Sequence, residues 1–244
     1  MVAAEAMSVA VITDSHANLP ALEASLERID ELGAEAVYCG GDLVGYGPHP
    51  NEACELIEQR GIPTIYGNHD YAIARNLGDC GCAYVDQHDR EIGQLSIEWT
   101  LAHTSEQSKA FMHDLPFDLR FELGGKRVRL VHGSPRKVNE YLYEDREART
   151  FERIAALADC DVLVFGHTHT TWMREYGGVL FVNCGSAGKP KDGDPRASFA
   201  LLTASGTGLD VAIERVAYDI EAVAAEIREV GLPEELAEKL QLAA

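Results

Sequence analysis

The sequence predicts a mixed α/β protein, with α+β character, in which two β-sheets pack face to face and helices lie outside them. In the first half of the chain, short apolar runs alternate with helical segments, as in parallel strands joined by helices. In the second half, pairs of strand-like runs are separated by turn residues such as Gly124-Gly125 and Gly177-Gly178, which indicates hairpins. Two packed sheets with helices outside account for both halves.

The first half is expected to form a β-α-β-α-β arrangement. Its strands are predicted at residues 8–13, 36–39 and 62–66, and its helices at 20–33 and 51–60. Pro20 at the first turn and Gly33 at the end of the first helix are typical residues at helix ends. Residues 70–114 carry no strand signal and are expected to be mostly helical, with apolar positions that predict helices at 89–103 and 105–113.

The second half is expected to contain three hairpins. Their strands are predicted at 117–123 and 127–131, at 171–176 and 179–183, and at 198–203 and 208–215. A helix at 147–158 and a strand at 162–165 lie between the first two hairpins, and helices at 219–230 and 233–242 follow the third. No stretch resembles a linker or a repeat, so we expect one domain over residues 1–244.

Charge and composition limit the partners of the chain. With 21 basic and 40 acidic residues the formal net charge is −19, which argues against general nucleic-acid binding. No cationic segment precedes the first strand, and no apolar stretch approaches the roughly 20 residues that span a bilayer. We therefore expect a cytoplasmic protein without a membrane segment. The sequence leaves the oligomeric state open, a homo-oligomer included.

Residues that can bind a metal follow five of the predicted strands. They are Asp14, His16, Asp42, Asn68, His69, His132, His167 and His169. Ligands collect at the carboxyl ends of strands in α/β sheets, so the pattern predicts a metal centre. Asp42 lies between glycine-containing segments that allow close backbone approach, and it could bridge two ions. We expect two divalent cations, and mixed oxygen and imidazole ligands do not select among Mn, Fe, Zn, Ni and Co.

Five short blocks carry these residues in order: DSH (14–16), GDLVG (41–45), GNHD (67–70), VHGSP (131–135) and GHTH (166–169). In this order and spacing the chain resembles the calcineurin-like metallophosphoesterases, and in particular their small bacterial and archaeal branch. The resemblance covers residues 8–216 and leaves the helices within 219–242 outside it. It implies a four-layer α-β-β-α sandwich.

The resemblance also implies roles for the residues of these blocks. One metal ion would be bound by Asp14, His16 and His169, and the other by Asn68, His132 and His167. Asp42 would bridge the two ions. His69 would be catalytic, facing the scissile phosphate without binding metal.

The activity that the resemblance implies is hydrolysis of small phosphorylated substrates, either phosphomonoesters or phosphodiesters, by attack of a metal-bridging hydroxide. A phosphoprotein phosphatase of the serine/threonine type and a dinucleotide phosphatase of the same superfamily are the alternatives. The protein phosphatases carry an Asp-Arg pair after the bridging aspartate, and residues 43–46 (LVGY) lack both. A partner-binding scaffold that has lost metal ligands is disfavoured, because every expected ligand is retained.

Other residues have weaker signals. Asn18 could cap the helix that follows it or contact substrate, and capping is the better interpretation. His49 and Arg136 lie in loops from which they could reach substrate, and Lys189 and Lys191 are comparable. Tyr46, Tyr141 and Tyr143 could stack on a nucleobase or simply pack. Cys80 and Cys82 form C-G-C, which is a weak signal for a zinc or redox site, and free buried thiols are expected instead.

Overall fold

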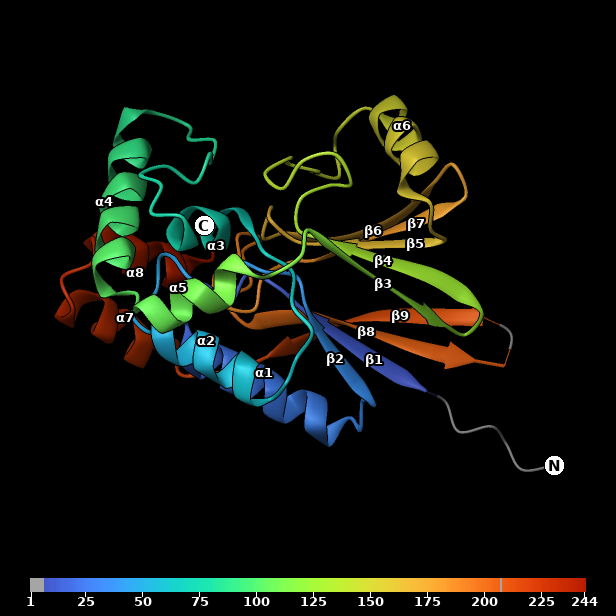
Figure 1. Cartoon of the computed structure of the whole chain (residues 1–244), viewed down its shortest axis with the longest axis horizontal. Helices are drawn as coiled ribbons and strands as arrows, with labels where there is room; N and C mark the ends of the chain where they lie inside the picture. The colour runs from blue at the N-terminus through green and yellow to red at the C-terminus, as the bar shows by residue number, and fades with distance from the viewer. Residues whose placement is uncertain (1–6, 207) are drawn as a thin grey trace.

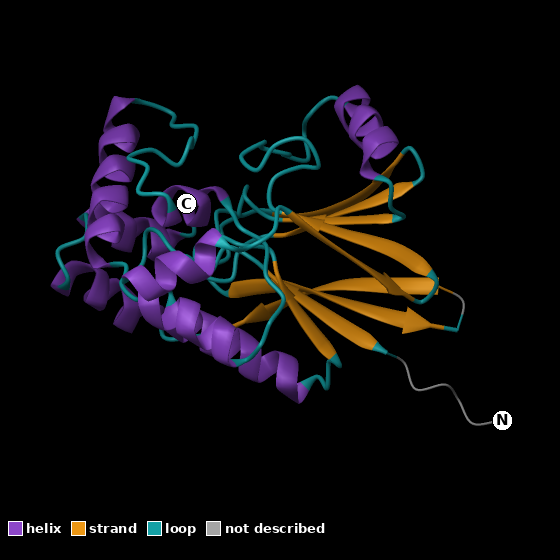
Figure 2. Ribbon diagram, viewed as in Figure 1, coloured by secondary structure: helices purple, strands orange, loops and turns teal. Residues whose placement is uncertain are grey.

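A computed structural model describes residues 7–206 and 208–244. Two β-sheets face each other, and helices lie on their outer faces and at one end (Figures 1 and 2). The expected fold class, a mixed α/β sandwich of four layers, is confirmed. No described helix is long and apolar enough to cross a membrane.

The first sheet combines the N-terminal β-α-β unit with the last hairpin. Its strand order is β2 (Ala36–Cys39), β1 (Ser8–Ile12), β8 (Ala197–Ser205) and β9 (Gly208–Val216). β1 and β2 are parallel, as expected for strands joined by a helix, while β8 runs antiparallel to β1. The carboxyl ends of β1 and β2 therefore lie side by side.

The second sheet has a parallel centre and antiparallel edges. Its order is β3 (Asp118–Leu123), β4 (Lys126–Val131), β5 (Val162–Phe165), β7 (Val179–Cys184) and β6 (Thr171–Tyr176). β4, β5 and β7 are parallel neighbours. The residues that follow β4 and β5 consequently emerge at the same edge of this sheet.

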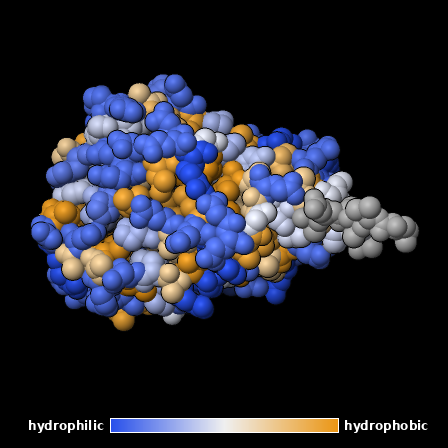
Figure 3. All heavy atoms as spheres, turned by 90° about the horizontal axis from the view of Figure 1, so that it is seen from below, coloured by the Kyte–Doolittle hydropathy of each residue, from blue (hydrophilic) through white to orange (hydrophobic). Residues whose placement is uncertain are grey.

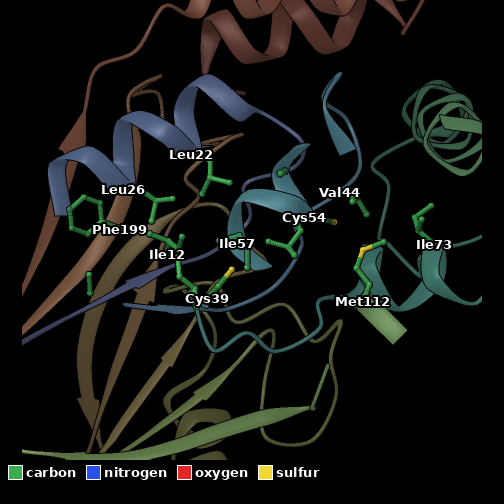
Figure 4. Packing of buried hydrophobic residues seen from close by; sticks show 14 of the residues in the cluster. Ile12, Leu22, Leu26, Cys39, Val44, Cys54, Ile57, Ile73, Met112 and Phe199 are labelled. Atoms are coloured by element: carbon green, nitrogen blue, oxygen red, sulfur yellow. The ribbon is translucent and has the colours of Figure 1, made fainter. Parts of the chain in front are cut away.

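Three hydrophobic clusters hold the layers together. Between the sheets, buried side chains such as Val11, Val164 and Ala200 are in contact. On the outer face of the first sheet, α1 (Leu19–Glu31) and α2 (Pro50–Gln59) pack through Leu22, Leu26 and Ile57 against residues such as Ile12 and Phe199 (Figure 4). On the outer face of the second sheet, α6 (Ala148–Ala158) packs against aromatic residues of β5 and β7.

The remaining helices gather at one end of the sandwich (Figure 2). They are α3 (Asn68–Ala74), α4 (Gln87–His103), α5 (Glu106–His113), α7 (Ile220–Glu229) and α8 (Glu234–Leu242). The two C-terminal helices pack together and reach Ile92 of α4 through a fourth hydrophobic cluster. Hydrophilic residues cover much of the face in Figure 3, with smaller groups of hydrophobic residues among them.

The strand expected at residues 62–66 is wrong in extent. Only Thr64 forms a parallel bridge, with Cys39 of β2. The backbone N–H of Ile65 donates to Cys39, but the N–H of Tyr66 donates to Pro116, so the chain leaves β2 after one pairing. Asn68 therefore begins a short helix, α3, instead of following a strand.

Candidate metal centre

Seven predicted metal-binding residues meet at one end of the sandwich, most of them in the loops that follow the parallel strands. All of them have side chains that are almost fully buried, and they are Asp14, His16, Asp42, Asn68, His132, His167 and His169. Potential ligand atoms form overlapping groups within 4.8 Å. One joins Asp14, His16 and His169, and another joins Asp42, His132 and His167. Asp42 also groups with His16 and His69, so it lies between the two sets.

The backbone at this place is strained. Five of the seven residues adopt left-handed φ angles between 46° and 66°, namely Asp14, His16, Asp42, His167 and His169. A residue with a Cβ rarely adopts this conformation, and such strain clusters where side chains must be aimed at a ligand. The turns thus direct the side chains of adjacent loops toward one point.

Three imidazole rings are oriented by backbone carbonyl groups. The Nδ1 atom of His16 lies 3.0 Å from the carbonyl oxygen of Val44, and that of His132 lies 2.8 Å from the oxygen of Gly40. The Nδ1 atom of His169 lies 2.6 Å from the oxygen of Lys189. A carbonyl can only accept, so each Nδ1 carries a proton, and each ring in its neutral form presents its Nε2 lone pair.

These lone pairs converge on one point. The Nε2 atoms of His16 and His169 are 3.0 Å apart, and the Nε2 atom of His169 is 3.2 Å from Oδ1 of Asp14. Two neutral rings that both donate through Nδ1 cannot hydrogen-bond to each other through Nε2. A cation at this point would satisfy all three atoms, so the donor set fits a metal ion.

The second group of ligand residues, which contains Asp42, Asn68, His132 and His167, also brings potential ligand atoms close together. The Nε2 atom of His132 is 3.2 Å from Oδ1 of Asn68 and 3.3 Å from Oδ2 of Asp42. The Nε2 atom of His167 and Oδ1 of Asp14 are buried without a hydrogen-bond partner among the described residues. Buried polar atoms are rarely left without a partner, and those that are need an explanation such as an ion.

The two carboxylates are held on their other oxygen. Oδ2 of Asp14 accepts from the Thr13 hydroxyl at 2.6 Å and from the backbone N–H of His167 at 3.0 Å. Oδ1 of Asp42 accepts from the backbone N–H of His69 at 2.8 Å. Only glycine fits at position 67, because a Cβ there would lie 2.0 Å from Oδ1 of Asp42.

Asp70 holds the loop that carries Asp42. Its carboxylate accepts from the backbone N–H groups of Asp42, Leu43 and Gly67 at 2.6, 2.8 and 2.9 Å. Burial and then the Asp42 charge raise the pKa of Asp70 to about 6. This carboxylate therefore joins α3 to the loop after β2 and does not orient His69.

Burial and charge separate the pKa values of the imidazoles. Burial lowers the pKa of His167 to about 3, with a further contribution from His132. Burial also lowers the pKa of His132, but the carboxylates of Asp42 and Asp14 outweigh it and raise the value to about 10. A proton on His132 thus occupies the position that a cation would take beside Asp42.

His69 is buried between the loop after β2 and the loop before α4. A Cβ on Gly45 would lie 2.4 Å from its Nδ1 atom, which has no hydrogen-bond partner among the described residues. Its Nε2 atom is 3.5 Å from Sγ of Cys82. Burial lowers the pKa of His69, while Cys82 and Asp42 raise it to about 8.

The side chains of the three residues with weaker signals for substrate contact are hydrogen-bonded or ion-paired to other residues. Asn18 caps α1 by accepting from Ala21, as expected, and its amide donates to Gly188 and Tyr218. His49 lies 2.8 Å from a carboxylate oxygen of Glu226 in α7. Arg136 is exposed and paired with Glu140. Asn18 nevertheless lines a small pocket together with His16, whereas His49 and Arg136 form no hydrogen bond or ion pair with the metal-binding residues described above.

Two features near the centre had only weak signals in the sequence. Lys189 is 5% exposed, and its ammonium group lies 5.0 Å from the ring centroid of Tyr46. It forms no ion pair with a described carboxylate, and burial, followed by the charge of Lys191, holds its pKa well below the ordinary value. Cys82 contacts His69. Both follow glycine-rich loops, a signal too common to identify them.

A cavity of about 260 Å³ adjoins this region. Cys82, Lys189 and Lys191 line it together with the aromatic residues Tyr46, Tyr84, Tyr141 and Tyr143. The rings of Tyr141 and Tyr143 stack at 5.7 Å with an angle of 14°. The wall of the cavity therefore combines aromatic rings with lysine side chains, and it also carries Asp89.

Known proteins resemble this chain along its length. It is 32% identical to an uncharacterized protein of Methanocaldococcus jannaschii, over 96% of this chain and 97% of that protein. It is 26% identical to the phosphodiesterase YfcE of Escherichia coli, over 80% of this chain and 87% of the enzyme. The crystal structure of a metallophosphoesterase from Sphaerobacter thermophilus superposes with a TM-score of 0.75 at 31% identity and covers 98% and 99% of the two chains.

The model of the calcineurin-like phosphoesterase superfamily domain matches residues 7–207, which contain the whole cluster of buried carboxylates and imidazoles. Together with the full-length relatives, this match shows that the chain belongs to the calcineurin-like phosphoesterase superfamily.

Proposed function

We propose that this phosphoester hydrolase holds two divalent cations side by side. Asp14, His16 and His169 would bind one of them, and Asn68, His132 and His167 the other. Asp42 would bind both, because it belongs to ligand groups on either side. The observation that carries the proposal is the 3.0 Å distance between the Nε2 atoms of His16 and His169. The lone pairs of both atoms face the same point, and a cation there would accept both.

The cations would supply a strong nucleophile at neutral pH and electrostatic stabilisation of the phosphoryl oxygens. The ligands do not select one metal, since carboxylate, amide and imidazole donors suit several first-row ions. Manganese thus stays a prediction, as does a cytoplasmic location.

His69 would protonate the leaving oxygen. It follows the ligand Asn68 directly, and its backbone N–H donates to Asp42, so the ring is fixed beside the centre without being needed for binding. The charges of Cys82 and Asp42 favour the imidazolium form that a general acid needs.

We propose phosphodiesters as the preferred substrates. Gly45 and Tyr46 stand where the protein phosphatases have the Asp-Arg pair, so no arginine from this loop grips a phosphate dianion. Lys189 is a buried lysine on the wall of the adjoining cavity, and in its protonated form it would bind one non-bridging oxygen or a neighbouring phosphate. The similarity to a phosphodiesterase supports this preference.

A nucleotide ester is a second candidate within this class. The cavity beside Lys189 has four tyrosines on its wall, and a nucleobase stacks on such rings. Lys191 lines the same cavity and would meet a further phosphate group, while Lys239 on this wall is paired with Asp89. Dinucleotides carry both chemical features.

The test is a metal count followed by a substrate panel. Protein purified without chelator and saturated with Mn²⁺ is expected to hold two ions per chain by inductively coupled plasma mass spectrometry. Bis-nitrophenyl phosphate and dinucleotides should then be hydrolysed faster than phosphoserine peptides. One ion per chain would contradict the two-cation proposal. Efficient dephosphorylation of peptides without diester cleavage would contradict the substrate preference alone.

A further inference from the structure

Two cysteines and an imidazole form a cluster beside the metal centre. Cys80 and Cys82 lie in the loop between α3 and α4, and their Sγ atoms are 2.9 Å apart. Sγ of Cys82 is 3.5 Å from Nε2 of His69, and the three atoms all lie within 4.8 Å of one another. The sequence presents only a lone C-G-C pair, and the fold adds the third potential ligand.

The spacing of the cluster suits a tetrahedral thiophilic ion. With Zn–S near 2.3 Å and Zn–N near 2.1 Å, tetrahedral angles separate N and S by about 3.6 Å and two S atoms by about 3.8 Å. The His69–Cys82 distance of 3.5 Å already matches. The two Sγ atoms would have to separate by about 0.9 Å, a change that rotation of one cysteine side chain supplies.

The loop that carries the cysteines is held at several points. The side-chain amide of Asn139 donates to the carbonyl of Gly81 at 2.7 Å, and the backbone N–H of Ala83 donates to the hydroxyl of Tyr141 at 3.1 Å. Gly81 has a φ of 69°, a conformation that favours glycine. Cys80 is buried and Cys82 is half-buried on the wall of the 260 Å³ cavity, so an ion could enter from there.

We propose that His69, Cys80 and Cys82 form a third cation site, selective for thiophilic divalent ions such as Zn²⁺ and Cd²⁺. Oxygen and imidazole donors make up the two-cation centre, whereas two thiolates favour softer ions. Three protein ligands leave a fourth position for water from the cavity. An ion bound at Nε2 takes a ring nitrogen of His69, the residue proposed to assist the leaving oxygen, so an ion at this site inhibits the enzyme. Only this inhibition rests on the proposed function.

Cadmium reports the site independently of activity. The reduced full-length protein, first loaded with two equivalents of Mn²⁺, is titrated with Cd²⁺ while the ultraviolet thiolate-to-cadmium charge-transfer band is recorded. Cadmium that replaces Mn²⁺ on oxygen and imidazole ligands produces no such band. We expect the band to saturate at one equivalent, to vanish in the Cys80→Ser/Cys82→Ser variant, and to persist in Cys160→Ser, the control at a buried cysteine in another cluster. An unchanged band in the double variant, or none in the wild type, would overturn the site.

Wild-type protein alone offers a second measurement if the double variant does not fold. Cd²⁺ should protect Cys80 and Cys82 from iodoacetamide, as read by peptide mass spectrometry, and equal alkylation with and without Cd²⁺ would overturn the site. Zn²⁺ at one equivalent beyond Mn²⁺ should slow alkyl-ester hydrolysis about 100-fold, within the range of general acid catalysis. Band formation without inhibition would leave the site standing and contradict the role proposed for His69.

Discussion

Asp42 and Asp14 are both buried carboxylates, but they have different neighbours. Asp42 belongs to ligand groups that contain His16 on one side and His132 with His167 on the other, whereas Asp14 groups only with His16 and His169. Loss of the Asp42 charge would remove negative charge from beside both proposed cations. Loss of the Asp14 charge would remove it mainly from beside one of them.

Asp42→Asn should therefore reduce turnover by about 100-fold or more relative to wild type. Asp14→Asn should reduce turnover by a smaller factor. Metal content after gel filtration and kcat on a diester are the measurements. Near-normal turnover with two metals per chain in Asp42→Asn would refute the shared-ligand role.

His69→Ala should keep two metals and lose about 10²–10⁴-fold of the turnover of an alkyl ester, because general acid assistance has this size. The loss should be much smaller for a nitrophenyl ester, whose leaving group is stable as an anion. Equal losses on the two esters would indicate electrostatic stabilisation instead of proton transfer, and loss of a metal would make His69 a ligand.

At the residue scale, the sequence predicted which side chains meet because each follows a strand or lies in a block of fixed spacing. His132 and Asp42, far apart in the chain, are 3.3 Å apart in the structure. The spacing of residues along the chain does not predict where the side chains of His49 and Arg136 point. Each residue lies in a loop from which the sequence allows it to reach substrate, but His49 is paired with Glu226 and Arg136 with Glu140. No local sequence pattern indicates these partners.

At the scale of elements, α3 and the loop after β2 form one unit through Asp70. Four backbone N–H groups in this region donate to its carboxylate, which is fully buried. The unit positions Asp42 near the start of the loop and Asn68 at the start of the helix. The sequence placed Asp70 next to His69 without revealing its partners.

Asp70→Asn should destabilise the fold by about 1–3 kcal/mol, since one amide oxygen cannot replace both carboxylate oxygens for buried donors. Urea unfolding followed by circular dichroism measures this, with the surface variant Asp79→Asn as the control. Weaker metal retention should accompany the change. A variant as stable as wild type would show that Asp70 does not hold the loop.

Most elements were predicted from the sequence within one or two residues, because their hydrophobic periodicity or turn residues are clear. β5 occupies 162–165 as expected. The segment 62–66 differs because an apolar run specifies burial, whereas strand length depends on how long the neighbour β2 stays alongside. Helix α3 was missed because seven residues show too little periodicity.

At the scale of the whole molecule, we propose that residues 8–216 and the C-terminal helices form one cooperative domain. The fourth hydrophobic cluster ties α7 and α8 to Ile92 of α4, and His49 meets Glu226 across the same boundary. The buried ligands also bring charge into the interior, which metal ions would compensate.

Thermal unfolding should accordingly give coincident near- and far-ultraviolet transitions, and chelation should lower the midpoint. Free metal at 100 times its Kd stabilises a site by about 2.7 kcal/mol, which corresponds to about 5–10 °C for a chain of this size. Separate transitions by the two probes would contradict the single domain, and a midpoint indifferent to chelation would contradict metal in the core.

Electron paramagnetic resonance of protein loaded with two equivalents of Mn²⁺ tests the two-cation centre most directly. Ions about 3.5–4 Å apart that share the Asp42 carboxylate should be spin-coupled. We expect the spectrum of an exchange-coupled pair, and its conversion to uncoupled Mn²⁺ in Asp42→Asn. A six-line spectrum of isolated Mn²⁺ from the fully loaded wild-type protein would contradict the account.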